Sequence, residues 1–164
     1  MISNPKHGWC NFVLRTFEGI PSYLTDVPVD LLEAFIDLHT KCTGISWFDE
    51  EGTEFTLVLT PYSLFIIEEK DKPVLHDFSE MKIENLEKEL IEDIEKDLVG
   101  WSEFITSDDR EEVMLHRDEI RQKIASMLTA MVCAASIFAG SCGSLIAEGV
   151  SYGEKIQYGD LYYQ

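Results

Sequence analysis

Basic residues are scarce in this sequence. The 164 residues include 13 Lys and Arg against 31 Asp and Glu, which gives a formal net charge of −18 at pH 7. A field of that sign repels the phosphate backbone of nucleic acids and the anionic surface of membranes. We therefore do not expect nucleic-acid or membrane-surface binding, and the charge favours cationic partners, basic proteins among them.

Paired cysteines and an export signal are also missing. The cysteines stand at 10, 42, 133 and 142 without a CxxC spacing, and the polar opening at residues 1–8 has no apolar stretch of the kind that secretory signals contain. Scattered thiols in a chain without an export signal are typical of reduced, cytoplasmic proteins. We therefore expect a cytoplasmic protein without disulfides, in which Cys42 and Cys133 fill core space.

The sequence has one long uncharged run, but it is weakly hydrophobic. The segment from Ile124 to Ala147 carries no charge and is long enough to span a bilayer. Small and weakly polar residues dominate it, and large aliphatic side chains are few. This composition favours a helix buried inside the protein, with no membrane association. A membrane span remains the alternative, since Arg117, Arg121 and Lys123 flank its N-terminal side.

The common catalytic and metal-binding motifs are absent from the sequence. It contains no GxxxxGK[ST], GxGxxG, GxSxG or HExxH motif. His39 and Cys42 are three residues apart on a predicted helix, which would suit a thiol nucleophile with a histidine base. The place of Cys42 on the apolar stripe of that helix favours a packed thiol instead. We expect no catalysis, metal or cofactor, and an enzyme using Cys42 and His39 is the least favoured alternative.

The hydrophobic pattern predicts a strand, a helix and then a run of strands. Residues 9–17 are aromatic and β-branched with rough alternation, and they predict the first strand. Residues 28–42 repeat apolar side chains every three or four positions, as a helix with one buried face does. Four further strands are predicted at 45–49, 53–60, 63–69 and 74–78.

The period becomes helical from Asp77, which begins a capping-box pattern. A short link at 101–105 separates this long helix from a second one. The second helix starts with the polar residues 106–109 and continues to Gly140.

These elements predict an α+β fold. We expect an antiparallel sheet of about five strands, one helix after the first strand, and two long C-terminal helices packed on the sheet. No internal repeat and no linker divides the chain. The prediction is a single domain over 1–164, with a sheet-rich part at 1–78, a helical part at 79–148 and a Tyr- and Gly-rich tail at 149–164.

Two groups of carboxylates are the candidate binding residues. One surrounds the predicted hairpin turn, and the other lies on the polar side of the first long helix. Their number gives a net charge well beyond the magnitude of about 2–8 that keeps a small domain soluble. We predict that they contact a basic protein, with a tryptophan as aromatic anchor; a solvated helix face and core tryptophans are the alternatives. The predicted contact residues are Asp49, Glu50, Glu51, Glu54, Glu84, Glu87, Glu92, Glu95, Trp47 and Trp101.

In composition and element order, residues 9–120 resemble the immunity proteins of bacterial polymorphic-toxin and contact-dependent inhibition systems. The resemblance rests on the stretch FEGIPSYLTDVPVDLLEAFIDLHTKCTGISWFDEEGTEFTLVLTPYSLFIIEEK. It implies neutralisation of a cognate toxin, often a basic nuclease, by acidic and aromatic groups that cover the active site of the toxin. No family motif matches residue by residue, so no site residue is carried over.

A second resemblance is to the class I chaperones of type III secretion, which are small, acidic and usually dimeric. Their opening helix and FDExG hairpin resemble LLEAFIDLHTKCTGISWFDEEGTEFTLVL. This chain departs from them by a strand before that helix and by long helices where further strands are expected. The alternative implied is a protein that binds a segment of a secreted effector.

Overall fold

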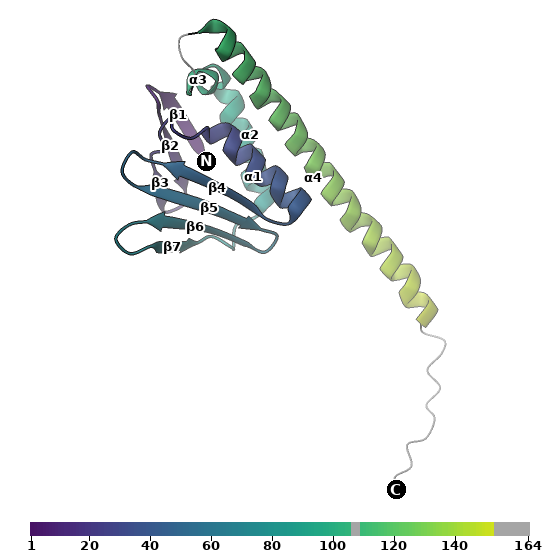
Figure 1. The fold of residues 1–164 in the computed structure, drawn as a ribbon. Helices are drawn as coiled ribbons and strands as arrows, with labels where there is room; N and C mark the ends of the chain where they lie inside the picture. Colours follow the sequence, from purple (N-terminus) through teal and green to yellow (C-terminus); the bar gives the residue numbers. More distant parts are fainter. Residues whose placement is uncertain (106–108, 153–164) are drawn as a thin grey trace. The chain divides into compact units, whose positions relative to one another are not determined.

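The computed structural model describes residues 1–105 and 109–152, with side chains described as far as residue 136. The chain divides into two units, Met1–Ala130 and Met131–Gln164. The first unit contains both sheets, three helices and the start of a fourth (Figure 1). In the second unit the described residues continue helix α4 (Arg110–Tyr152). The single domain predicted over the whole chain stays a prediction.

Two antiparallel sheets are present where the sequence predicted one. The first has the order β1 (Ile2–Lys6), β2 (Trp9–Leu14), β3 (Phe17–Gly19). The second has the order β4 (Gly44–Asp49), β5 (Glu54–Thr60), β6 (Ser63–Glu69), β7 (Val74–Asp77). The α+β class is confirmed, whereas one sheet of about five strands with a helix directly after the first strand is wrong.

Tight turns explain why the first sheet was missed. His7 and Gly8 have φ angles of 55° and 78°, and Lys6 pairs with Trp9 across them. Two successive residues with positive φ are what a two-residue hairpin turn requires. Arg15, with φ of 52°, lies in the next turn. Residues 9–17, predicted as one strand, therefore fold back to form β2 and the start of β3.

Helix α1 (Val27–Lys41) confirms the helix predicted over 28–42 to within one residue at each end. Pro28 lies in its first turn, and Cys42 ends it with a left-handed φ of 60°. The helix packs against β4 (Figure 1). The contact is so close that a Cβ on Gly44 would lie 1.9 Å from the carbonyl oxygen of Ala34. This approach explains the glycine at the start of β4.

The core lies between the two sheets and α1. Phe12 and Phe17 of the first sheet meet Phe48 and Phe55 of the second, with ring centroids 4.9 to 5.7 Å apart. All four side chains are buried. One face of the second sheet is thus committed to the core.

Two helices, α2 (Ile83–Lys96) and α3 (Leu98–Glu103), replace the first long helix and the link predicted after it. Asp77 does not cap a helix, because its carboxylate accepts hydrogen bonds from Ser79 in a local turn. The side chain of Asp97 instead caps α3 by accepting from the Gly100 N–H at 3.1 Å. The amino group of Met1 pairs with two carboxylates of α2, which ties β1 to that helix.

Helix α4 corrects the prediction of a buried segment from Ile124 to Ala147. Ile124 and Met127 are buried, but Leu128 and Val132 are 47% and 66% exposed, and Cys133 is also exposed. The side chains of 137–147 lie outside the described residues, as do 106–108 of the predicted helix start and 153–164 of the predicted tail. Within the described ranges, every helix is too short or too polar to span a bilayer.

Candidate functional site

The second sheet has one buried face and one face turned to solvent. Alternate side chains of a strand point to opposite faces. Towards the core point side chains such as Phe48, Phe55 and Leu57, which are at most 1% exposed. The opposite side is apolar as well. We call it the outer face, and its apolar side chains are Ile45, Trp47, Val58, Phe65, Ile67 and Leu75.

The strand register places the outer-face residues in two neighbouring rows. Ile45, Val58 and Phe65 are successive partners across β4, β5 and β6. The next row runs from Trp47 through Thr56 and Ile67 to Leu75. Ile45 is 61% exposed, Trp47 43% and Leu75 62%. Contiguous apolar side chains on an exposed surface indicate an interaction site.

A third row of the same face consists of carboxylates. Asp49, Glu54 and Glu69 are successive partners across β4, β5 and β6. Glu54 raises the pKa of Glu69 by a hydrogen bond and by its charge. Like charges directly opposite on neighbouring strands destabilise a sheet. A cationic side chain brought by a partner would relieve this repulsion.

Trp47 joins the apolar and acidic rows, whereas Trp101 belongs to the core. The Trp47 indole N–H donates to Glu54 at 2.8 Å while its ring stays partly exposed. Aromatic side chains with one polar end held in this way are frequent anchors of interfaces. Trp101 is 0% exposed and packs edge-to-face on Phe104. This burial removes Trp101 from the predicted contact residues.

The two other carboxylates of this turn differ: Glu50 has a structural role, and Glu51 is exposed to solvent. Glu50 accepts from the Ile20 N–H at 2.6 Å and from the Thr53 hydroxyl at 2.8 Å, which fixes the turn between β4 and β5. Glu51 is exposed and has a positive φ of 53°. The turn therefore presents Glu51 to solvent beside the acidic row, and Glu50 holds the loop in place.

The carboxylates predicted on the helix are not all available either. Glu84, Glu92 and Glu95 are exposed on α2. Glu87 is 0% exposed, and its carboxylate pairs with His39 of α1. Burial raises the pKa of Glu87, and the hydrogen bond from His39 opposes that rise. A carboxylate paired inside the fold cannot meet a partner, so Glu87 is removed from the predicted contact residues.

The side chains considered for catalysis are held in separate places. His39 pairs with Glu87, whereas Cys42 ends α1 with its thiol exposed. The prediction that Cys42 fills core space is wrong, because the left-handed turn at this residue takes it off the apolar stripe. In the part of the chain that the structure describes, no group of three His, Cys, Asp or Glu side chains is arranged so that it could hold a metal ion.

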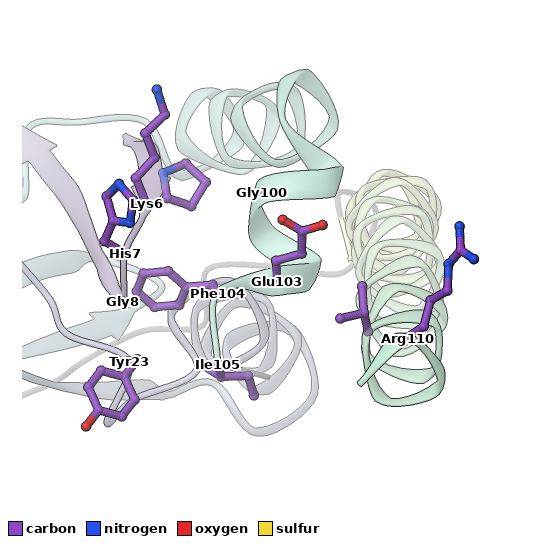
Figure 2. A pocket seen from close by; sticks show the side chains of 11 residues that line it. Lys6, His7, Gly8, Tyr23, Gly100, Glu103, Phe104, Ile105 and Arg110 are labelled. Atoms are coloured by element: carbon purple, nitrogen blue, oxygen red, sulfur yellow. The ribbon is translucent and has the colours of Figure 1, made fainter. Parts of the chain in front are cut away.

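A hollow of about 880 Å³ lies beside the turn between β1 and β2. Tyr23, Phe104 and Glu103 contribute to its lining (Figure 2). Figure 2 shows the charged ends of Lys6 and Arg110 directed away from the hollow. Ligand pockets usually carry polar groups that converge on the ligand. These do not converge, and we assign no site here.

Comparisons of the chain with protein-family models, curated proteins and solved structures gave no significant match. The resemblances noted in the sequence therefore gain no support from relatives. The outer face is the feature on which a function can be argued. Of its residues, the sequence had indicated Trp47, Asp49 and Glu54, and it had not indicated Glu69 or the apolar side chains.

Proposed function

We propose that this chain is a cytoplasmic binding protein that neutralises a basic protein, as an immunity protein neutralises its toxin. The observation that supports the proposal is the outer face, where apolar rows that are exposed at their ends and half-buried in the middle adjoin three aligned carboxylates. An apolar centre with a polar rim is the usual composition of a protein interface. The net charge of −18 would also accelerate association with a cationic partner.

Each part of the surface has its own role in the proposal. Trp47 is the anchor that enters a pocket of the partner, and the side chains around it exclude water. Asp49, Glu54 and Glu69 receive lysine or arginine side chains. A nuclease must attract phosphates and is therefore basic around its active site. A surface of this charge is complementary to such a site and would cover it.

The test is co-production with the protein encoded by the neighbouring open reading frame. We expect the chain to suppress the toxicity of that protein and to form a complex with it. Trp47→Ala should weaken the complex by about 30-fold or more, as loss of an anchor does. Tyr62→Ala is the matched control, because Tyr62 is 89% exposed in the turn after β5 and lies outside the outer face. Absence of a complex, or equal affinity in both variants, contradicts the proposal.

Charge reversal at two places separates docking from long-range attraction. Two triple variants change the net charge equally. One carries Asp49→Lys, Glu54→Lys and Glu69→Lys, and the other carries Glu84→Lys, Glu92→Lys and Glu95→Lys on α2. Both sets should slow association and reduce its salt dependence. Only the first set should also accelerate dissociation, because it changes the contact itself. Equal dissociation rates for both sets would place the contact elsewhere.

A further inference from the structure

Strand β4 is an edge strand, and part of its outward backbone has no hydrogen bond among the described residues. The second sheet begins with β4, and β5 is its only neighbour within the described chain. The C=O of Asp49 accepts from the Ser22 N–H at 2.7 Å, so the backbone of Asp49 points away from β5. Alternate residues of an antiparallel strand direct their N–H and C=O to the same side. The backbone N–H and C=O groups of Ile45 and Trp47 therefore also point away from β5. None of the hydrogen bonds between described residues engages these four groups.

A groove of about 280 Å³ follows this edge between β4 and α1. Figure 1 shows α1 running beside β4. The groove is lined by Asp30, Glu33, Ala34 and Asp37 of α1 and by Ile45, Ser46 and Trp47 of β4. Ile45 and Trp47 thus belong both to the groove and to the outer face, which makes the two surfaces continuous.

Among the described residues, one polar side chain of the groove has no hydrogen-bond partner, and one carboxylate has no cation beside it. Ser46 is 4% exposed, and its hydroxyl is buried without a hydrogen bond. Buried polar groups are normally hydrogen-bonded, so an isolated hydroxyl calls for an explanation. Glu33 pairs with Lys123 and Asp37 pairs with Lys41, but no described cation lies beside Asp30. A donor on a ligand in the groove would give Ser46 a partner, and a cation there would neutralise Asp30, whose carboxylate already accepts from the backbone N–H of Asp26.

We propose that the groove binds an extended basic segment of the protein partner, which joins the sheet as a strand beside β4. The main chain of the segment pairs with the outward groups of Ile45 and Trp47, as in other cases of strand addition. A lysine or arginine of the segment reaches Asp30. The inference rests on the proposed function, since it names the part of the basic partner that is recognised. A second copy of this acidic chain would bring charge of the wrong sign.

The electrostatics of Asp30 agree with this arrangement. Burial raises its pKa to about 6, and the charges of Asp26 and Glu33 contribute to the rise. The ionised carboxylate therefore lies in surroundings that disfavour it. A cation from the partner would stabilise the ionised form.

The experiment is a titration of the whole chain, at pH 7.5, with the end-capped peptide Lys-Val-Lys-Val-Lys-Val-Lys, followed by amide NMR. Alternate side chains allow lysines on the α1 side and valines on the side of the outer face. We expect the amide signals of Ile45 and Trp47 to shift, and those of Val74 and Leu75 on the opposite edge strand β7 to stay unchanged. Methylation of alternate peptide nitrogens should weaken binding about tenfold, because it removes main-chain donors.

Matched substitutions in the protein complete the test. Asp30→Asn should weaken peptide binding about tenfold, and Asp37→Asn less than twofold, because Asp37 already pairs with Lys41. No binding at millimolar peptide, equal binding of the methylated peptide, or equal effects of the two substitutions would overturn strand addition. A Trp47-dependent complex with the neighbouring protein would then still support the proposed function. Peptide binding at β4 without that complex would contradict the proposed function alone.

Discussion

The two faces of the second sheet are built from similar residues but have different surroundings. Phe55 of the inner face is 0% exposed, whereas Ile45 and Leu75 of the outer face are more than half exposed. Burial of apolar surface contributes about 25 cal/mol per Å². The inner face has made this contribution to folding. The apolar surface of the outer face is still partly exposed to water, and on our proposal it becomes buried when the partner binds.

The charged groups show the same contrast. Inside, the Glu87 carboxylate pairs with His39, and His116 pairs with Asp26. On the outer face, Glu54 raises the pKa of Glu69 by a hydrogen bond and by its charge, and no ion pair between described residues neutralises either carboxylate. A lysine or arginine of a partner could neutralise these two carboxylates, which the described part of the fold leaves without a cation. The difference between the faces separates residues that stabilise the fold from residues that are free to bind.

The largest effect should come from truncating one phenylalanine on each face. Phe55→Ala removes a buried ring and should lower the free energy of unfolding by about 3–5 kcal/mol. Phe65→Ala, at a half-buried position of the outer face, should lower it by about 1–2 kcal/mol. Urea unfolding followed by fluorescence measures both. Equal losses would show that the outer face is packed within the fold, and the contrast between the faces would disappear.

The next effect concerns a buried charge with its partners in place. The ring nitrogens of His116 each lie 3.0 Å from an acceptor, the Ser102 carbonyl oxygen and the Asp26 carboxylate. Both nitrogens must therefore donate, which requires the protonated ring. Burial lowers the pKa of His116, but these hydrogen bonds outweigh it and raise the pKa above its ordinary value of 6.5.

A pKa raised by folding gives a stabilisation that is complete below pH 6.5 and is lost as the pH rises through the folded-state pKa. At pH 5.5 the wild type should exceed His116→Gln by about 1–2 kcal/mol in free energy of unfolding. The difference should shrink at pH 9. Urea unfolding at the two pH values measures it, and a difference independent of pH would contradict the protonated ring.

A smaller effect of opposite sign is expected at Asp30, which lacks a cation. Its pKa, raised from 3.8 to about 6, means that folding favours the protonated carboxyl. Wild-type stability should therefore fall as the pH rises from about 4 through 6. Asp30→Asn should be more stable than wild type by about 1 kcal/mol at pH 7.5 and about equal to it at pH 3.5. Thermal unfolding across this range tests it, and a variant less stable than wild type at pH 7.5 would show that the fold favours the ionised Asp30, against this prediction.

Local patterns were sufficient for α1 and for β4 to β6. Apolar and polar residues alternate in these strands, and Pro28, Gly44 and Gly52 mark where elements begin or end. These signals act within a few residues, and the predicted bounds of α1, β4, β5 and β6 agree with the structure to within one residue. Strand β1 was missed because Ile2–Lys6 contains a proline and few β-formers, and pairing with β2 determines its conformation. A local sequence pattern cannot predict a strand whose conformation depends on tertiary pairing.

The site was predicted only at one end for a similar reason. The segment SLFIIEE is apolar on both faces of β6, which already indicates a strand with two apolar sides. Which side is covered depends on the phenylalanines of a distant sheet. The burial of Glu87 likewise depends on His39, which is 48 residues away in sequence. Long-range packing decides which apolar and charged residues remain for a partner.

The smallest perturbation uses two thiols in different surroundings. Cys10 is buried, and burial raises its pKa to about 12, whereas Cys42 is exposed. In the native protein at pH 8, iodoacetamide should modify Cys42 at least about 100-fold faster than Cys10, since the thiolate is the reactive form. Peptide mapping measures both rates, and in urea they should converge. Comparable rates in the native protein would show that the reagent reaches the interior around β2. The inner side of the fold would then not be closed to solvent, and the contrast with the outer face would be contradicted.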